Sequence, residues 1–321
     1  MRQLDSIRGV VFLDKTNVNE MSRKALARKM SVVLTQKVHS ELMTCADVVA
    51  TGRYPYTGHF GILSKEDQKI TEEAMELVHV RQLQDRDFMK ISDGQKQRVM
   101  LARALCQEPE IILLDEPTSF LDIKYKLEFL SVIQNMSRSR NLSVIMSLHE
   151  LELAQRISDK ILCIKGDKVD RFGPPEEVFV DGYISALYDL DAGSYDGLTG
   201  NVELEPVKGE PRVFVIAGGG NGTAFFRRLQ RMGIPFATGI LWKNDLDYPT
   251  AKALACEVVE IPPFCWIQEK DIVRAKQLID RCEKVICVVK MEISGDFRAE
   301  LETLLRYAKK EGKWCEGEFC I

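Results

Sequence analysis

The sequence has little that would suit a membrane span, a nucleic-acid surface or a secreted protein. None of its apolar runs approaches the roughly 20 residues that a membrane-spanning helix needs. Neither sign of charge dominates the 321 residues, because 44 Lys and Arg stand against 48 Asp and Glu, so no nucleic-acid partner is expected. The first residues lack the apolar stretch of a secretory signal. We therefore expect the nine cysteines to be free thiols in a reducing cytosol.

Short β-rich runs alternate with helical periodicity over the first half of the chain. Strands are expected at residues 10–13, 31–34, 111–114, 143–147 and 161–164. At about residues 40–105 the apolar side chains instead recur three or four positions apart, as at Ile70, Ala74 and Leu77, which predicts a helical subdomain. The alternation as a whole predicts an α/β domain with a mostly parallel sheet over residues 1–185.

A second domain is expected after a linker. Residues 186–211 lose the periodicity and gather glycine and proline, which is typical of a linker. Residues 212–321 repeat a strand–helix pattern four times, which predicts a small doubly wound, Rossmann-like α/β domain. The first strand of this domain ends in the turn Gly218-Gly219-Gly220-Asn221-Gly222. The turn falls short of G-x-G-x-x-G because residue 223 is threonine. It is interpreted either as a tight structural turn or as a site for a ligand phosphate in a regulatory sensor.

Two adjacent carboxylates give the strongest chemical signal. Asp115 and Glu116 follow the apolar run Ile111-Ile112-Leu113-Leu114, so a buried strand would carry them to its carboxyl edge. Asp115 could bind Mg²⁺ there, and Glu116 could polarise a water for attack on a phosphoryl group. By itself the pattern fits equally well a buried strand that ends in an acidic turn.

Four other segments accompany this pair. Ser92 and Gly94 open a predicted helix, where a hydroxyl and exposed backbone N–H groups favour phosphate. Asp122 follows the carboxylates, His149 follows the next strand, and Gln36 closes an earlier one. The order and spacing of all five features together are hard to produce by chance.

These features resemble the ATP-binding cassette family over about residues 1–180. Ser92-Asp93-Gly94-Gln95 is similar to the signature motif, Asp115-Glu116 to the Walker B pair, Asp122 to the D-loop, His149 to the switch histidine and Gln36 to the Q-loop. The resemblance implies that two cassettes pair head to tail and bind ATP with Mg²⁺, the signature of one completing the site of the other. It implies nucleotide-binding roles for Ser92, Gly94, Gln95, Asp122, Asp115 and Gln36, the last two near the metal. Glu116 would be the general base, and His149 would contact the γ-phosphate.

Two further segments narrow the resemblance. Residues 47–55 and 118–123 are similar to the ATPase subunits of importers for iron-siderophores, haem and cobalamin. The similarity implies a homodimer, peripheral to the cytoplasmic face of the cell membrane, that drives integral-membrane permease subunits. An extracytoplasmic substrate-binding protein would be an indirect partner. The helical insert, over roughly residues 40–90, would carry the groove for the permease.

The sequence departs from the family pattern at two places. A phosphate-cradling Gly-x-x-x-x-Gly-Lys-Ser/Thr is absent from the 321 residues, and Gly9 is the only glycine among the first 51. We expect either that the chain begins downstream of its own P-loop or that the cassette is degenerate. In both cases these residues would hydrolyse ATP poorly or not at all. Asp93 is the second departure, because the family usually has glycine there and a carboxylate repels phosphate.

Two other functions are considered. A soluble cassette of the DNA-repair or translation type would carry a long coiled coil or a second cassette, whereas here 55 residues separate Gln36 from Ser92 and one signature is present. The remaining alternative is a non-catalytic regulatory or binding protein whose degenerate cassette serves as a dimerisation platform. The missing P-loop favours this alternative, and the retained Glu116 and His149 oppose it.

Overall fold

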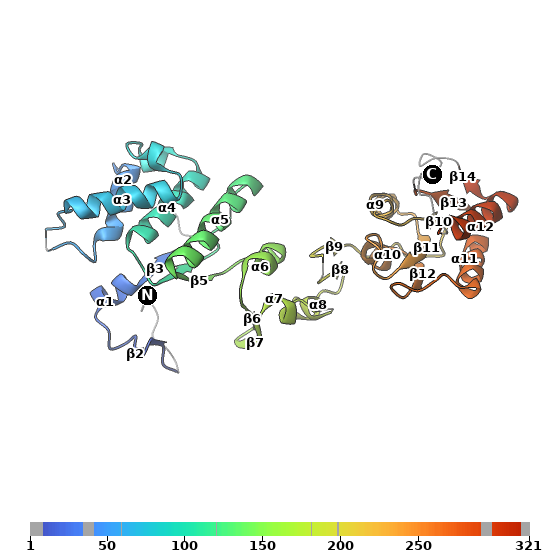
Figure 1. Ribbon diagram of the computed structural model, residues 1–321, viewed down its shortest axis with the longest axis horizontal. Coiled ribbons are helices and arrows are strands. Elements are labelled where there is room, and N and C mark those ends of the chain that lie inside the picture. The colour runs from blue at the N-terminus through green and yellow to red at the C-terminus, as the bar shows by residue number, and fades with distance from the viewer. Residues whose placement is uncertain are drawn as a thin grey trace. The chain divides into compact units, whose positions relative to one another are not determined.

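The chain folds into two compact units. The computed structural model describes residues 9–34, 42–58, 60–119, 121–180, 182–197, 199–289 and 297–315. The units comprise Met1–Asp159 and Lys160–Ile321 (Figure 1). The predicted boundary at residue 185 and the predicted linker at residues 186–211 stay predictions. In the described part of the chain, no helix is long and apolar enough to cross a membrane.

A parallel sheet of three strands forms the centre of the first unit. Its order is β3 (Met30–Val33), β4 (Ile111–Leu114) and β5 (Ser143–Met146). Met30 pairs with Ile111, and Ile111 pairs with Ser143. The predicted strands at residues 31–34, 111–114 and 143–147 are thus confirmed to within one residue. A short antiparallel pair, β1 (Phe12–Leu13) and β2 (Thr16–Asn17), and helix α1 (Arg23–Lys29) precede them.

The segment between β3 and β4 is helical, as its periodicity predicts. It contains α2 (Cys45–Ala50), α3 (Lys65–Leu77) and α4 (Asp93–Cys106), with short 3-10 turns η1 (Thr51–Arg53), η2 (Arg81–Leu83) and η3 (Phe88–Lys90). Helices α2, α3 and α4 pack against one another (Figure 1). Each is preceded by a hydroxyl residue whose side chain accepts the backbone N–H three positions on. The side chain of the third helical residue accepts the backbone N–H of that hydroxyl residue in return. These reciprocal caps stabilise all three helix starts.

Two helices complete the first unit. Helix α5 (Ile123–Arg140) buries Phe129, Leu130 and Ile133 in the same core as Ile112 and Leu114 of β4. It ends at Asn141, whose φ of 52° is left-handed and stops the helix. Helix α6 (Leu151–Ile157) follows β5. The three strands and these helices bring the ends of β4 and β5 to one edge of the sheet.

The second unit starts with small antiparallel elements. Strand β6 (Ile161–Lys165) pairs with β7 (Lys168–Gly173), and helices α7 (Pro175–Val178) and α8 (Tyr183–Leu187) follow. A further hairpin, β8 (Ser194–Tyr195) with β9 (Val202–Glu203), lies within the residues predicted to be a linker. Glu203 of this hairpin is buried and accepts hydrogen bonds from Arg227 and Thr250. The hairpin is therefore attached to the following domain by an ion pair whose carboxylate is buried and whose Arg227 side chain is 41% exposed.

The second sheet is parallel and doubly wound, as predicted. Its order is β12-β11-β10-β13-β14. The elements are β10 (Val213–Ile216), α9 (Thr223–Arg231), β11 (Phe236–Trp242), α10 (Tyr248–Leu254), β12 (Glu257–Ile261), α11 (Glu269–Arg281), β13 (Lys284–Cys287), α12 (Phe297–Lys310) and β14 (Trp314–Cys315). Helices α11 and α12 share one core with the sheet, and α9 and α10 share the other. The eight described cysteines are free thiols.

Candidate nucleotide site and the glycine-rich turn of the second unit

The two predicted carboxylates lie just after β4. The backbone N–H of Asp115 still bonds to the carbonyl of Val33 at 2.9 Å, so Asp115 continues the ladder between β4 and β3. Glu116 has a φ of 44°, in the left-handed region that a side chain rarely adopts. The chain therefore leaves the sheet at Glu116, with the two carboxylates at the carboxyl edge.

Ser147 joins the pair to the end of β5. Its hydroxyl donates to Asp115 Oδ1 at 3.0 Å and accepts the backbone N–H of Glu116 at 2.8 Å. One side chain thus fixes both the carboxylate of Asp115 and the backbone of Glu116. This role of Ser147 was not predicted from the sequence. The available signal was that Ser147 is the first residue after a strand that neighbours β4.

His149 contacts the carboxylate of Glu116 directly. His149 Nε2 lies 2.5 Å from Glu116 Oε1, and Ser119 Oγ donates to Glu116 Oε2 at 3.2 Å. The His149 side chain is 74% exposed and that of Glu116 is 35% exposed, so both can meet a ligand from solvent. A carboxylate held by an imidazole and a hydroxyl at a strand end can position a water and accept its proton. The structure therefore brings together Asp115, Glu116 and His149.

Glu150, a further carboxylate beside the site, has a structural role. Glu150 accepts a hydrogen bond from Lys126 on α5 at 2.5 Å and another from the buried Thr118 hydroxyl at 3.0 Å. The Lys126 ammonium holds the pKa of Glu150 below its usual range. This network ties the segment after β4 to the segment after β5 and to α5. Lys126 and Glu150 were not predicted from the sequence, and Thr118 was noted there only as part of the segment 118–123.

The predicted signature residues form the start of α4. Ser92 is the N-cap, and its hydroxyl accepts the backbone N–H of Gln95 at 3.3 Å while Gln95 Oε1 accepts the N–H of Ser92 at 3.0 Å. Asp93 has a side chain that is 57% exposed, and it lies 3.8 Å from Lys96. The helix start is therefore formed by contacts within the chain, and the charge of Asp93 has a cationic neighbour.

The predicted D-loop residue lies beside this helix start. Asp122 is the N-cap of α5, and its carboxylate accepts the backbone N–H of Tyr125 at 3.0 Å. A Cβ at Gly94 would come within 3.2 Å of Leu121 Cδ2. Gly94 thus allows the start of α4 to pack closely on the segment that leads into α5.

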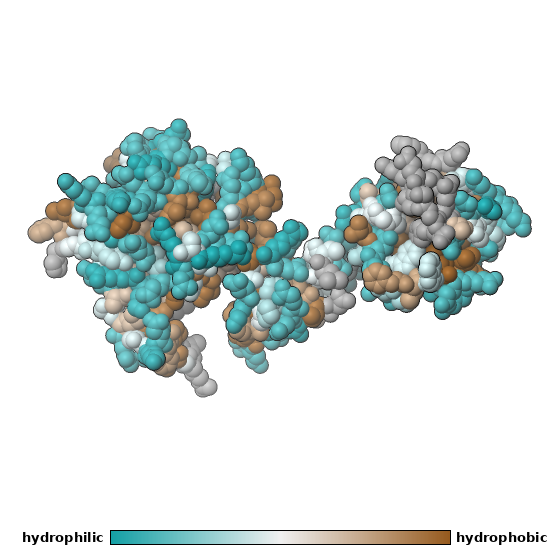
Figure 2. Space-filling model, in the orientation of Figure 1, coloured by the Kyte–Doolittle hydropathy of each residue, from teal (hydrophilic) through white to brown (hydrophobic). Residues whose placement is uncertain are grey.

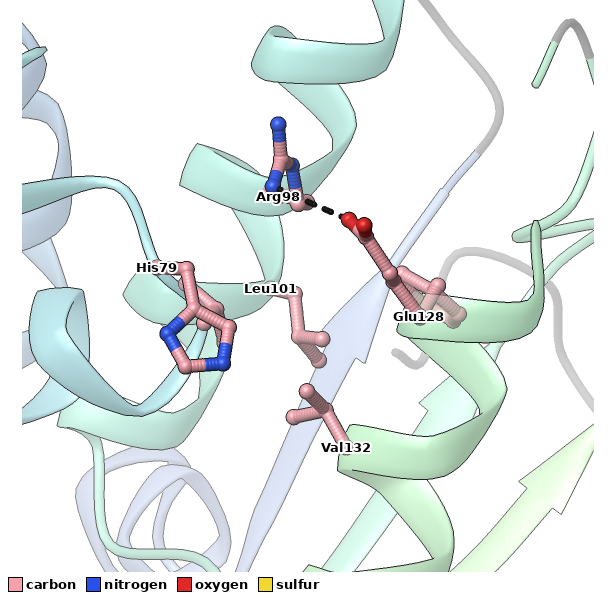
Figure 3. Close-up of a pocket in the computed structure, with 7 residues that line it drawn as sticks. His79, Arg98, Leu101, Glu128 and Val132 are labelled. Carbon is pink, nitrogen blue, oxygen red and sulfur yellow. Dashed lines mark ion pairs between the residues drawn. The ribbon is translucent and has the colours of Figure 1, made fainter. Parts of the chain in front are cut away.

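Further along, α4 is tied to α5 by an arginine. Arg98 lies 3.6 Å from Glu128, and its guanidinium stands over the ring of Tyr125 at 4.9 Å. A small, mainly apolar cavity lies between these helices and the segment after α3 (Figure 3). Its lining residues are Val78, His79, Arg98, Leu101, Glu128, Phe129 and Val132. Because it is apolar and away from Glu116, this cavity belongs to the helical core.

The donor set fits a metal ion that arrives with a nucleotide. Within the described ranges, no group of three His, Cys, Asp or Glu side chains is arranged to hold a metal ion. Mg²⁺ in phosphoryl-transfer sites takes one or two carboxylates, and phosphates and water supply its other ligands. Asp115, at the strand end, suits that arrangement as the carboxylate ligand. Gln36, the other predicted metal neighbour, lies outside the described residues.

The glycine-rich turn of the second unit is occupied by carboxylates of the same chain. Asp245 accepts the backbone N–H of Gly219 at 2.9 Å. Asp247, which is fully buried, accepts the N–H groups of Gly222 and Thr223, both at 2.8 Å. A Cβ at Gly222 would lie 2.6 Å from Ala217 Cβ, so close packing also requires glycine there. Of the two interpretations of this turn, these contacts favour the structural one.

Comparison with known proteins finds two family models that match parts of the chain. A model of the ABC transporter family matches residues 1–119, and a model of the MJ0874 family matches residues 236–315. The chain is 43% identical over 224 residues to the uncharacterised ABC transporter ATP-binding protein MJ0873 of Methanocaldococcus jannaschii, covering 69% of this chain and 77% of that protein. This chain therefore belongs to the ATP-binding subunits of ABC transporters.

Further matches bear on the extent of the similarity. The cobalamin import ATP-binding protein BtuD of Halobacterium salinarum is 30% identical over 287 residues, which cover 87% of this chain and 72% of that protein. Relatives named for import of achromobactin, petrobactin, iron(3+)-hydroxamate or siderophores cover 59% to 65% of this chain. The solved structure of cbiO1 from Clostridium perfringens is 23% identical, with a TM-score of 0.49, and covers 59% of this chain and 75% of its own.

Proposed function

We propose that this chain, once supplied with the P-loop that the 321 residues do not contain, acts as the ATP-hydrolysing subunit of an importer whose cargo is a corrinoid such as cobalamin. The single observation that carries the hydrolytic role is the contact between Glu116 and His149 at 2.5 Å, beside Asp115. A buried carboxylate with a structural role would be expected to pair with a cationic side chain or to accept the N–H groups at a helix start. Here the acid instead faces an exposed imidazole at the carboxyl edge of a parallel sheet, where such sheets bind ligands.

The site residues have separate roles in this proposal. Mg²⁺, when bound with ATP, would neutralise phosphate charge. Asp115 would be the carboxylate ligand of the metal. Ser147 keeps the carboxylate of Asp115 in place. Glu116 orients the attacking water and accepts its proton. His149 holds Glu116 and reaches toward the γ-phosphate. Gln36 is proposed as a further metal neighbour on the strength of the family resemblance alone.

The other half of each nucleotide site is proposed to come from a second copy of the chain. Ser92, Gly94 and Gln95 offer a capped helix start with backbone N–H groups, which favours an anion. Asp122 stands next to them at the start of α5. In a head-to-tail homodimer these residues would close over the nucleotide that Asp115 and Glu116 of the partner hold.

The choice of a corrinoid cargo rests on the extent of the matches. The relatives named for iron-siderophore import cover at most 65% of this chain. The relative named for cobalamin import covers 87%, which leaves too few residues outside the alignment to omit the second sheet domain. The alignment with the cobalamin import subunit therefore extends into the second sheet domain.

The helical insert is proposed to contact integral-membrane permease subunits at the cytoplasmic face of the membrane. Tyr54, Phe60 and Ile62, between η1 and α3, are 77%, 91% and 77% exposed. The buried Arg53 anchors the start of this segment through Asp67 at 2.8 Å and the carbonyl of Cys106 at 2.9 Å. Exposed apolar side chains on an anchored segment are typical of a protein contact. An extracytoplasmic substrate-binding protein would act only through the permease.

A second candidate function is a non-catalytic regulatory protein that uses the cassette for dimerisation. The observation that favours it is the absence of Gly-x-x-x-x-Gly-Lys-Ser/Thr from the 321 residues. The intact contact between Glu116 and His149 opposes it, because dimerisation alone does not need that pair.

Uptake by cells with and without the gene tests the proposal. We expect loss of the gene to abolish uptake of labelled cyanocobalamin and to leave uptake of a ferric hydroxamate unchanged. The wild-type gene should restore uptake, and Glu116→Gln should not. Restoration by Glu116→Gln would support the non-catalytic candidate, and loss of ferric hydroxamate uptake alone would contradict the corrinoid assignment.

A further inference from the structure

The segment between η1 and α3 carries exposed apolar side chains. Tyr54, Phe60 and Ile62 are each at least 77% exposed. In Figure 2, tan and brown atoms stand at the left edge of the first unit, where Figure 1 draws the loop that leads into α3. Single exposed apolar side chains are ordinary, whereas several gathered on one segment mark an interaction site.

The start of this segment is fixed to α4. The Tyr56 hydroxyl donates to the carbonyl of Gln107, the residue that ends α4, at 3.0 Å. A Cβ at Gly52 would collide with the carbonyl oxygen of Arg103, so η1 lies directly against the helix. The side chain of Tyr54 therefore projects from a backbone that is held in place.

Two cations of α1 lie against the same segment. Lys24 and Arg28 are exposed, and their spacing of four positions places them on one face of the helix. The Lys24 ammonium donates to the carbonyl of Thr57 at 3.4 Å, and Arg28 Nε donates to the carbonyl of Pro55 at 3.2 Å. The Arg28 guanidinium also stands 5.0 Å from the centre of the Tyr56 ring. Both positive charges are thus placed along the segment by contacts with neutral groups.

A third cation reaches the segment from α4. Arg103 is half-buried, and its Nε donates to the Thr51 hydroxyl at 2.9 Å, which in turn donates to the carbonyl of Val48 at 2.6 Å. Burial lowers the pKa of the Arg103 guanidinium. Within the described residues, Lys24, Arg28 and Arg103, here called the basic cluster, form no ion pair. Their charges are therefore available to an anion from outside this part of the chain.

Arg53, in the same segment, shows how a cation with a structural role is matched. It lies 2.8 Å from Asp67 and 2.8 Å from Glu108. A single exposed cation without such partners would be ordinary, but three of them surround one apolar segment in a chain whose formal net charge is −4. Charges of one sign beside an apolar surface favour a partner of the opposite sign. The planar fork of a guanidinium matches a carboxylate in particular.

A carboxylate of a protein fits this surface better than the headgroups of a bilayer. Phe60 and Ile62 protrude, whereas Arg103 is half-buried. A flat lipid surface would meet the apolar side chains first and leave this guanidinium without an anion. An acidic side chain that extends from a folded segment can reach it.

We propose that the basic cluster and the apolar segment beside it together bind a permease segment in which carboxylates accompany apolar side chains. The apolar side chains of that segment cover Tyr54, Phe60 and Ile62, and its carboxylates pair with the basic cluster. The inference rests on the proposed function for the identification of the partner as a permease. The unpaired charges and the exposed apolar groups define the chemistry of the partner.

Photo-cross-linking in cells that produce the full chain tests this inference. Tyr54 is replaced by p-benzoylphenylalanine, and the cross-linked peptide of the partner is identified by mass spectrometry. We expect a peptide of an integral-membrane protein in which Asp or Glu stands among apolar residues. Lys24→Glu/Arg28→Glu, at exposed positions, should lower the cross-link yield by roughly tenfold or more, because attraction across the interface becomes repulsion.

Charge exchange separates a lost contact from a lost fold. Lysine in place of the acids of the cross-linked peptide should restore the yield with the charge-reversed chain, which a misfolded variant could not do. Arg103→Gln, which removes only the third charge, should also lower the yield. The control is Arg138→Glu/Arg140→Glu, the same change of net charge at exposed positions near the end of α5, and it should leave the yield unchanged.

A cross-linked peptide without acids would overturn the inference, as would cross-links to lipid alone, the absence of any cross-link, or a yield that Lys24→Glu/Arg28→Glu does not change. If uptake of cyanocobalamin nevertheless depends on the gene, that result rejects the acidic contact and leaves the importer function standing. An acidic peptide that passes the charge exchange supports the contact even where cyanocobalamin uptake does not depend on the gene, and only the cargo is then rejected.

Discussion

His149 Nε2 lies 2.5 Å from Glu116 Oε1, although 33 positions separate the two residues in the sequence. Neighbouring parallel strands produce this contact, because β4 and β5 run side by side and end at the same edge. Ser147 closes the gap between the two strand ends with one hydrogen bond to each residue of the acidic pair. The site is thus built from the carboxyl ends of two strands.

Removal of the Ser147 hydroxyl should destabilise the first unit. Ser147→Ala removes the acceptor of the Glu116 N–H and the donor to Asp115, both at exposed positions, so we expect a loss of about 0.5–1.5 kcal/mol in the free energy of unfolding. Urea denaturation measures it. Ser143→Ala, at an exposed position on the same strand, is the matched control and should change the free energy by less than about 0.5 kcal/mol. Equal effects of the two substitutions would contradict the bridging role.

Arg53 is expected to be the main anchor of the helical insert. Its side chain is 5% exposed and bonds to Asp67, Glu108 and the carbonyl of Cys106. Arg53→Ala leaves the buried carboxylate of Asp67 without its partner, which typically costs about 3–5 kcal/mol. Chemical denaturation should show this loss, whereas Arg23→Ala, at an exposed position of α1, should be nearly neutral. Near-wild-type stability of Arg53→Ala would show that the segment of Tyr54 is not held as described.

Asp247 should be essential for the second unit. Its buried carboxylate accepts the N–H groups of Gly222 and Thr223 and the Thr223 hydroxyl. Asp247→Ala would leave buried donors unpaired, at about 1–3 kcal/mol for each. We expect faster hydrogen exchange at residues 219–223 and lower unfolding stability, with Glu205→Ala, an exposed acid, as control. If exchange at the turn stays slow, the carboxylate is not what holds it.

The stability contributed by Glu150 should disappear in acid. Because the hydrogen bond from Lys126 lowers the pKa of Glu150 below its ordinary 4.5, the contribution is complete above that value and is lost as the pH falls through the lower folded-state pKa. Glu150→Gln should therefore be less stable than wild type at pH 7, with the difference shrinking below pH 4.5. Glu152→Gln, which removes an exposed pair with Arg156 on α6, should show a small difference at both pH values.

The sequence allowed the strands and the acidic pair to be predicted, because alternating apolar runs and adjacent carboxylates are local signals. It did not predict Ser147 or Glu150 as partners of the site, since their roles arise only when β5 pairs with β4. The same holds for Asp245 and Asp247. Which backbone N–H groups they occupy depends on how two connections fold over one sheet edge, and no spacing in the chain encodes that.

The predicted linker shows a different limit. Its glycine and proline content indicated irregular structure, yet β9 lies there and Glu203 is buried against Arg227. Nothing in the polar segment around Glu203 indicates that this residue pairs with an arginine 24 positions further along the chain. Long-range ion pairs of this kind become visible only in the folded chain.

The central claim is that Glu116 of one copy and Ser92 of a second copy act on the same nucleotide. It is tested most directly by mixing two inactive variants, Ser92→Arg and Glu116→Gln, each made in a version of the chain that carries an added P-loop segment. In a twofold dimer, random mixing leaves one intact site in half of the dimers, so we predict recovery of about a quarter of the wild-type ATP turnover. Turnover in the mixture no higher than that of either variant alone would contradict the account.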